Sequence, residues 1–156
     1  MSLASVKSYF SKLGLENRIK ILYESSATVE EAATALNCLP ENIAKTMSFS
    51  LENKNILIVM AGDTKVDNKK YKAIFGKRAK MIPRELVEES VGHLPGGVCP
   101  FAIKDEVDVY LDESLKKFSL VYPAAGDDHS AVELTPNELE KYSYAKEWID
   151  VGKGWE

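Results

Sequence analysis

The sequence holds few side chains that could form a catalytic centre by themselves. Lys45 follows a short predicted helix and opens a predicted strand, with Thr46 directly after it. An ammonium is a compact charge with three donors, suited to a phosphate or to a developing oxyanion. The Thr46 hydroxyl can bond a ligand or a neighbouring strand. Residue type alone favours an ordinary surface role for such a lysine.

A second candidate is the loop between 92 and 101, which contains two prolines and three glycines. Gly96 and Gly97 permit positive φ and close approach of the main chain to a ligand, while Pro100 stiffens the end of the loop. Taken alone, Pro-Gly-Gly indicates only a turn.

Two further polar residues have competing interpretations. Asp112 could contact substrate, but it is better placed to cap the segment Glu113 to Lys117. His129 could titrate near neutral pH and serve as a base. A hydrogen-bonded histidine at a strand end is the commoner arrangement.

The cysteines suggest one alternative enzyme class. Cys99 with His93 or His129 as its base would make a cysteine hydrolase, which requires a thiolate. Cys38 and Cys99 form no CxxC pair, so neither a disulfide framework nor a zinc site is indicated. We expect no metal and no cofactor.

Composition suits one globular domain over residues 1–156, with 45% hydrophobic residues and a net charge of −4. The chain has no run of about 18 apolar residues and no basic-then-apolar start typical of a secretion signal. We therefore expect a cytoplasmic protein that has no membrane partner and is a monomer or a weak homodimer.

Positive charge is concentrated in the segment from Lys65 to Arg84 of this acidic chain. Within that segment Asp67 is the only acid, and the basic residues are Lys65, Lys69, Lys70, Lys72, Lys77, Arg78, Lys80 and Arg84. Lys69, Lys70 and Lys72 are candidates for contacts with nucleic-acid phosphates. The alternative is an ordinary solvated helix face.

Helix and strand signals alternate along the chain and predict an α/β (α+β mixed) fold. Capping residues predict helices that begin after Thr28, Asp67 and Thr135. A helix is also expected around Val6 to Leu13, and another from Pro83 to Gly92. Strands are expected at 19–23, 46–51, 56–60, 79–82, 107–111, 120–122 and 129–134.

Four separated motifs together resemble a known family. They are Ile43-Ala44-Lys45-Thr46, the loop 92–101, Asp112-Glu113-Ser114, and Ala125-Gly126 ahead of Val132-Glu133-Leu134-Thr135-Pro136. In order and approximate spacing they are similar to the YbaK/EbsC family, the editing domains associated with prolyl-tRNA synthetase, from about Val29 to Tyr142. The resemblance implies a mixed sheet forming a partial barrel with flanking helices, and a cleft for the aminoacyl end of tRNA.

The resemblance also implies roles for individual residues. Lys45 matches the functional lysine, and Gly96 and Pro100 match the family's GxxxP loop, for which the resemblance implies binding of the terminal adenosine. Ala102 departs from the glycine often found there in relatives. The remaining substrate-binding candidates are Thr46, Gly97, Asp112, Ala125, Gly126 and His129.

The implied activity is hydrolysis in trans of mischarged tRNA, with water activated by the neighbouring ribose hydroxyl. The expected substrate is proline tRNA carrying a small amino acid, and an aminoacyl-tRNA synthetase is a further candidate partner. Ala124-Ala125-Gly126 replaces the Ser-Gly-Gly of the cysteine-removing branch, which favours selection of small side chains by fit. The alternative from another class is a non-catalytic tRNA-binding module or amino-acid sensor.

Overall fold

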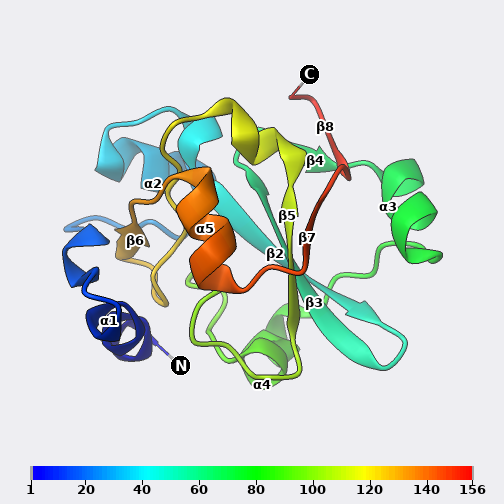
Figure 1. The fold of residues 1–156 in the computed structure, drawn as a ribbon, viewed down its shortest axis with the longest axis horizontal. Helices are drawn as coiled ribbons and strands as arrows, with labels where there is room; N and C mark the ends of the chain where they lie inside the picture. Colours follow the sequence, from blue (N-terminus) through cyan, green and yellow to red (C-terminus); the bar gives the residue numbers. More distant parts are fainter. Residues whose placement is uncertain (1, 156) are drawn as a thin grey trace.

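A computed structural model describes residues 2–155 and shows a mixed α/β fold around a four-stranded sheet (Figure 1). The strands run in the order β2 (Ala44–Leu51), β3 (Lys54–Ala61), β5 (Asp108–Asp112) and β7 (Glu147–Ile149). β2 pairs antiparallel with β3, whereas the β3–β5 and β5–β7 pairs are parallel. This sheet keeps β2 and β7 as its edges, so the described strands form no closed barrel.

The central strand β3 is buried on both faces, as its continuous apolar run predicts. Ile56, Ile58 and Met60 face one core cluster. The alternate side chains of Leu57, Val59 and Ala61 face the larger cluster on the other side. The sheet therefore separates two hydrophobic cores.

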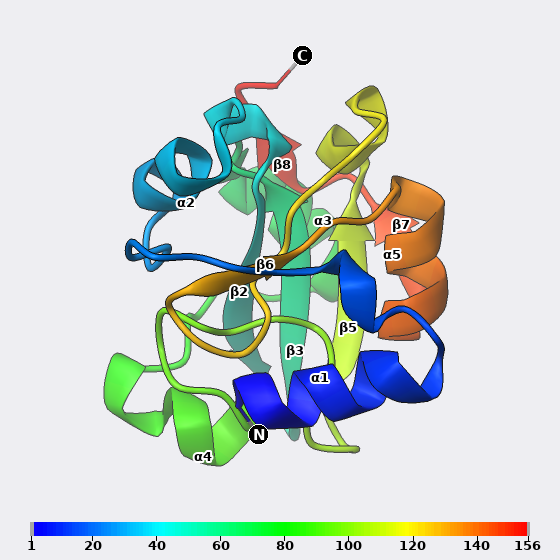
Figure 2. The ribbon, with the colours of Figure 1, turned by 90° about the vertical axis from the view of Figure 1, so that its left-hand side faces the viewer.

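Helices cover these two faces unequally. α1 (Leu3–Lys12) and α5 (Pro136–Ser143) pack through Phe10 and Leu139 onto the larger core. α3 (Asn68–Phe75) covers the other face through Tyr71. Figure 2 shows α1 and α5 in front of the sheet and α3 behind it.

Two short sheets and several turns complete the fold. β1 (Ile19–Ile21) pairs with β6 (Ser130–Val132), and β4 (Lys65–Val66) pairs with β8 (Gly152–Lys153). The helices α2 (Val29–Leu36) and α4 (Val87–Val91) lie at the periphery. Single 3₁₀ segments occupy Glu16–Arg18, Pro40–Asn42, Arg84–Leu86 and Glu113–Lys117.

Capping signals predicted helix starts correctly. Thr28 and Thr135 each form a capping box, with Glu31 and Glu138 respectively, and Asp67 accepts the Lys69 and Lys70 amides. No helix of the described chain is long and apolar enough to cross a membrane.

Two predicted strands are wrong in extent. The segment 79–82 makes only a single bridge, Phe49 with Met81, and the segment 120–122 contributes only isolated bridges to Ile43 and Leu134. The helix expected from Pro83 is a 3₁₀ turn that leads into the shorter α4 and ends at Gly92. Short extended segments need partners along their whole length to form a ladder, and these have partners at single positions.

Candidate functional site

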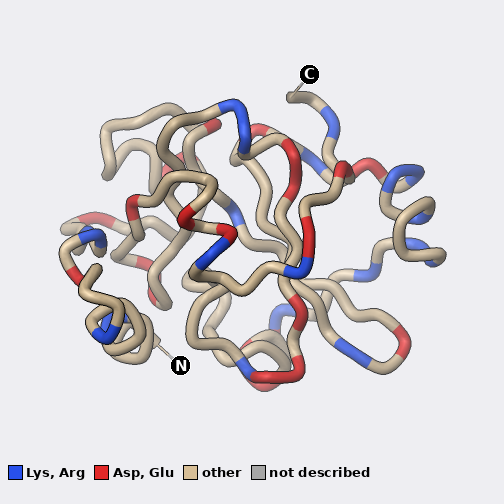
Figure 3. The backbone as a smooth tube through the Cα atoms, in the orientation of Figure 1, with Lys and Arg blue, Asp and Glu red and all other residues tan. Residues whose placement is uncertain are grey.

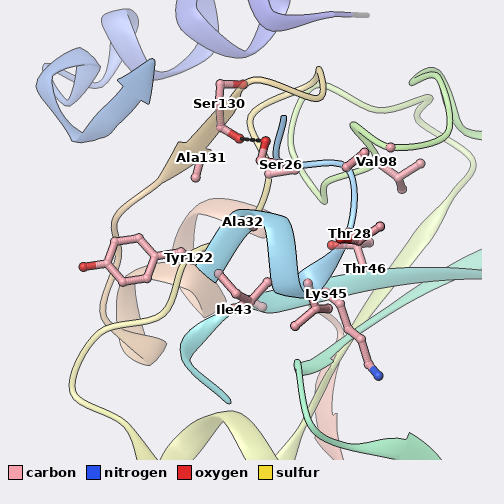
Figure 4. Close-up of a pocket in the computed structure, with 15 residues that line it drawn as sticks. Ser26, Thr28, Ala32, Ile43, Lys45, Thr46, Val98, Tyr122, Ser130 and Ala131 are labelled. Atoms are coloured by element: carbon pink, nitrogen blue, oxygen red, sulfur yellow. Dashed lines mark hydrogen bonds between the residues drawn. The ribbon is translucent and has the colours of Figure 1, made fainter. Parts of the chain in front are cut away.

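A cavity of about 160 Å³ lies where four distant segments meet. It is bounded by the start of α2, the start of β2, the glycine loop and β6 with the segment before it (Figure 4). The lining residues are Ser26, Ala27, Thr28, Val29, Ala32, Ile43, Ala44, Lys45, Thr46, Gly96, Val98, Tyr122, Ala124, Ser130 and Ala131. The lining thus combines small apolar side chains with hydroxyl groups.

The hydroxyl groups differ in how far they are already engaged. Thr28 Oγ1 accepts the Glu31 amide at 3.1 Å, and Ser130 Oγ donates to Asp127 at 2.6 Å. Ser26 Oγ donates to the Ser130 carbonyl over a long 3.4 Å. Thr46 Oγ1 is buried and has no hydrogen-bond partner among the described residues. A buried hydroxyl without a partner costs free energy, which a ligand's polar group would recover.

Lys45 and Thr46 both line the cavity but point to opposite sides of β2. Lys45 is the direct partner of Met60 in the β2–β3 pairing, and the Met60 side chain belongs to the smaller core. Because direct partners place their side chains on the same face of a sheet, the Lys45 side chain also lies on the face of the smaller core. Figure 4 shows the Lys45 ammonium directed away from the centre of the cavity. The Lys45 stem therefore forms part of the wall, and its charge lies outside.

Burial lowers the pKa of Lys45, and the nearby Lys65 ammonium lowers it further, while Asp63 and Glu30 oppose the shift. Burial acts because removing water disfavours the charged form. A desolvated ammonium interacts more strongly with an approaching anion than an exposed one does. Lys45 thus has the surroundings expected of a group that binds negative charge.

The glycine loop reaches the cavity through Gly96 but not through Pro100. Gly96 has φ +92°, a conformation that L side chains rarely adopt, and it lines the cavity. A Cβ on Gly97 would lie 2.6 Å from the Asp127 Cα, so the loop packs directly against that backbone. Pro100 instead lines a separate hollow of about 390 Å³ near α1.

Asp112 is held by the protein's own backbone. It is fully buried, and its carboxylate accepts the Ser114 amide at 3.1 Å and the Val151 amide at 2.8 Å. The expected cap of Glu113–Lys117 is confirmed. Asp112 does not line the cavity, and it has a structural role at the end of β5.

Three other predicted substrate-binding residues also lie outside the cavity lining. Ala125 is fully buried in the larger core, whereas its neighbour Ala124 lines the cavity. Gly126 packs against the Ser2 carbonyl oxygen, 2.5 Å from the position of an added Cβ. His129 is exposed, and its Nδ1 lies 2.8 Å from Asp128 Oδ1.

Cys99 and His93 are close but poorly suited to nucleophilic chemistry. Cys99 Sγ lies 3.5 Å from His93 Nε2, and both residues are fully buried. Burial raises the pKa of the Cys99 thiol to about 12 and lowers the pKa of His93. The thiol therefore stays protonated and beyond the reach of a substrate, which argues against the cysteine-hydrolase alternative.

The lysines of α3, blue in Figure 3, lie far from this cavity. Figures 1 and 2 together place α3 at the end of the molecule opposite α2 and β6. Lys69 and Lys72 are exposed, whereas Lys70 Nζ donates to Asp150 at 3.0 Å and to the Gly152 carbonyl at 2.8 Å. Within residues 2–155, no group of three or more His, Cys, Asp or Glu is arranged to hold a metal ion.

Sequence reasoning missed several residues that form the walls. Ser26, Tyr122, Ser130 and Ala131 line the cavity although none belongs to a recognisable motif. The pairing of β1 with β6 and the bridge between Ala124 and Ala131 bring them together. Of these four residues, only Ser26 could have been suspected from the sequence, because it lies in a serine-rich stretch just before the Thr28 cap, where hydroxyls lie beside the start of a helix.

Comparison with known proteins gives consistent similarities. Residues 23–142 match the model of the aminoacyl-tRNA editing domain family. The uncharacterized protein YwhH of Bacillus subtilis strain 168 is 49% identical, with 100% of each chain covered. A protein of Enterococcus faecalis provisionally named Cys-tRNA(Pro)/Cys-tRNA(Cys) deacylase EbsC is 28% identical over 74% of this chain and 72% of its own length.

Longer proteins and solved structures also match. The proline–tRNA ligase of Bacillus pumilus is 30% identical over 70% of this chain, which corresponds to 20% of the ligase. A crystal structure described as a proposed trans-editing enzyme for prolyl tRNA synthetase superimposes with a TM-score of 0.87 at 27% identity, covering 97% of each chain.

Proposed function

Because the chain belongs to the aminoacyl-tRNA editing domain family, we propose that it is a deacylase that hydrolyses the ester of mischarged tRNA in trans. The observation that carries this proposal is the small cavity, which joins an apolar wall, an unpartnered Thr46 hydroxyl and the Lys45 stem. The match to EbsC over 72% of that protein's length supports a free-standing mode of action.

The chemistry of the cavity favours activation of water by the substrate. Among the residues that the structure describes, no carboxylate, imidazole or thiol lines the cavity. An aminoacyl ester is already activated, so its hydrolysis needs mainly a positioned water and stabilisation of the oxyanion. The ribose hydroxyl beside the ester can take the part that a protein base would otherwise play.

The size of the cavity limits what it can hold. About 160 Å³ is close to the roughly 150 Å³ of an engineered cavity that binds benzene. A small aminoacyl group fits such a space, whereas a nucleoside does not. We place the terminal adenosine outside, against the main chain around Gly96.

The partner is a mischarged tRNA, and we propose proline tRNA carrying a small amino acid as the substrate. The matches to a proline–tRNA ligase and to a proposed trans-editing enzyme for prolyl tRNA synthetase support this choice. Lys69 and Lys72 lie far from the cavity, so any contact that they make with tRNA would be with the acceptor stem, farther from the ester. Such contacts stay a prediction. Lys70 is already engaged within the protein.

The decisive experiment is a deacylation assay on a panel of mischarged tRNAs. Alanyl, seryl, cysteinyl and threonyl esters of proline tRNA are incubated with purified protein, and release of the amino acid is compared with the enzyme-free rate. We expect at least one small ester to be hydrolysed faster. If the folded protein binds these tRNAs but leaves every ester at its spontaneous rate, the non-catalytic alternative replaces this proposal.

A further inference from the structure

Lys65 and Lys153 form a pair of like charges on one small sheet. They are direct partners in the antiparallel pairing of β4 with β8, so their side chains lie on the same face of this ribbon. Like charges directly opposite each other destabilise a sheet, so the pair opposes folding unless an anion lies between them.

Within residues 2–155, neither lysine forms an ion pair that would offset this repulsion. Both side chains are exposed. Two acids, Asp63 and Asp67, lie two residues from Lys65 in sequence. Asp67 uses one carboxylate oxygen to cap the Lys69 and Lys70 amides at 2.9 and 3.2 Å, and its charge also acts on Lys153 without forming an ion pair. The Lys70 ammonium beside β8 is bound to Asp150 and Gly152. Lys65 and Lys153 therefore present two positive charges to the solvent.

Lys45 connects this pair to the cavity. Its stem lines the wall, and Figure 4 shows its ammonium leaving the cavity on the outer side of β2. The charges of Asp63 and Lys65 both act on Lys45, so the Lys45 and Lys65 ammonium groups lie within electrostatic range of each other with one carboxylate beside them. The three lysines thus form a basic edge that begins at the cavity wall.

We propose that the basic edge of Lys45, Lys65 and Lys153 binds consecutive phosphates of the unpaired 3′ end of tRNA. The inference rests on the proposed function in taking a tRNA end as the ligand. When the aminoacyl group occupies the cavity, the RNA backbone that precedes it must run across the rim of the cavity, which places its phosphates there. A row of ammonium groups binds a phosphodiester backbone as point charges, without reading its sequence. The same edge gives an acidic protein a local site for RNA, distinct from α3.

The test uses RNA binding, which does not depend on turnover. The probe is an uncharged RNA hairpin that ends in unpaired CCA, and its affinity is measured at several salt concentrations. For the double variant Lys65→Gln, Lys153→Gln, we expect weaker binding and a salt slope that is smaller by about 0.7 for each phosphate that the variant no longer neutralises. A hairpin with a blunt end, lacking CCA, should bind the wild type and this variant equally.

A matched control separates the basic edge from general charge. Lys12→Gln, Lys80→Gln removes two exposed lysines elsewhere. We expect this control to keep the wild-type salt slope with the CCA hairpin. Equal slopes for the wild type and the edge variant would overturn the proposal, as would an equal loss in the Lys12, Lys80 control.

Thermal unfolding supplies a second readout. Removing the repulsion should leave the edge variant at least as stable as the wild type without RNA, while the CCA hairpin should raise its melting temperature less. A destabilised variant whose RNA response matches that of the wild type would assign the pair a purely structural role. If the edge variant loses RNA binding but the wild type hydrolyses no ester, the deacylase proposal fails and this inference stands.

Discussion

Lys45 and Thr46 show how two neighbouring residues can meet different parts of one substrate. The pleat of β2 turns the Thr46 hydroxyl, which has no partner in the described chain, and the Lys45 ammonium to opposite faces. A ligand in the cavity can therefore bond Thr46, while its charged continuation outside meets Lys45. This division assigns Lys45 to a phosphate more readily than to the oxyanion of the ester.

The first prediction concerns the charge of Lys45. Lys45→Ala should lower kcat/KM for deacylation by about 30- to 1,000-fold, equivalent to about 2–4 kcal/mol, because it removes a partly desolvated positive charge that meets the substrate. Lys45→Met keeps an apolar stem against the cavity and should lose nearly as much activity. Steady-state kinetics with a mischarged tRNA measure both variants, and Lys12→Ala is the control. Near-normal activity in Lys45→Met would show that the stem, not the ammonium, matters.

The second prediction concerns Cys99, whose thiol is fully buried and has a pKa raised to about 12. In a Cys38→Ser background, Cys99 should resist iodoacetamide at pH 8 in the folded protein and react once it is unfolded. Mass spectrometry measures the extent of alkylation. Cys99→Ser should retain deacylation, because serine can keep the hydrogen bond to the Phe101 carbonyl. Rapid alkylation that abolishes activity and is blocked by substrate would instead favour a cysteine hydrolase.

At the scale of elements, short sequence motifs correctly predicted the features that depend on contacts between residues close together in the chain, such as the starts of helices. The capping residues before α2, α3 and α5 fixed those helix starts, since a cap and its partner lie within three residues. The strands β7 and β8 were missed because their short segments are set by pairing with β5 and β4, far away in sequence. The extended segment 79–82 has the right pattern but bridges the neighbouring β2 at one position only.

The third prediction concerns the ion pair that fixes the start of α5. Arg18 and Glu138 form two parallel hydrogen bonds of 2.8 Å, and Glu138 also accepts the Thr135 amide. The Arg18 hydrogen bond, as the largest cause, lowers the pKa of Glu138 to about 2. Glu138→Gln should cost about 1 kcal/mol at pH 7, a fall in Tm of about 2–4 °C.

The pH dependence of this difference follows from the sign of the shift. A carboxyl whose folded pKa is depressed stabilises the fold above its unfolded pKa of about 4.3. This contribution is lost as pH falls toward 2. Thermal melts of the wild type and Glu138→Gln should therefore converge between about pH 4.5 and 2. A constant difference in Tm across that range would contradict the assignment to the ionised carboxylate.

At the scale of the whole molecule, the cavity exists only because distant segments are brought together. Motifs in the sequence identified Lys45, Thr46 and Gly96, and all three line it. Ser26, Tyr122 and Ser130 could not be predicted, because their positions depend on the β1–β6 pairing and on the Ile43–Tyr122 bridge. The same motifs included Pro100, Asp112 and Gly126, which shape the surrounding backbone and do not reach the cavity.

The assembled cavity also determines how the molecule can choose among amino acids. Ala124 and Ala131 face the space, so no hydroxyl comes from the position before Ala125, whose own side chain lies in the core. Ser26, Thr28, Thr46 and Ser130 do supply hydroxyls, but those of Thr28 and Ser130 are already bonded to Glu31 and Asp127. Sorting by size requires that the Thr46 hydroxyl, which has no partner among the described residues, bond the ester group that all these substrates share. A site that sorts mainly by size separates side chains one methylene apart by only about 1–3 kcal/mol. We therefore expect discrimination against large groups and little among small ones.

The fourth prediction is the ratio of kcat/KM for alanyl, seryl and cysteinyl esters of proline tRNA, measured under identical conditions. All three should lie within about tenfold, or about 1.4 kcal/mol, of one another, with the prolyl ester assayed beside them as the cognate reference. Ala131→Val narrows the cavity and should lower kcat/KM for the cysteinyl ester more than for the alanyl ester. The control is Ala35→Val, which lies on the same helix as Ala32 but outside the cavity lining, and it should leave the ratio of these two kcat/KM values unchanged. A cysteinyl preference well above tenfold in the wild type would mean that a hydroxyl of the wall, and not its size, selects the substrate.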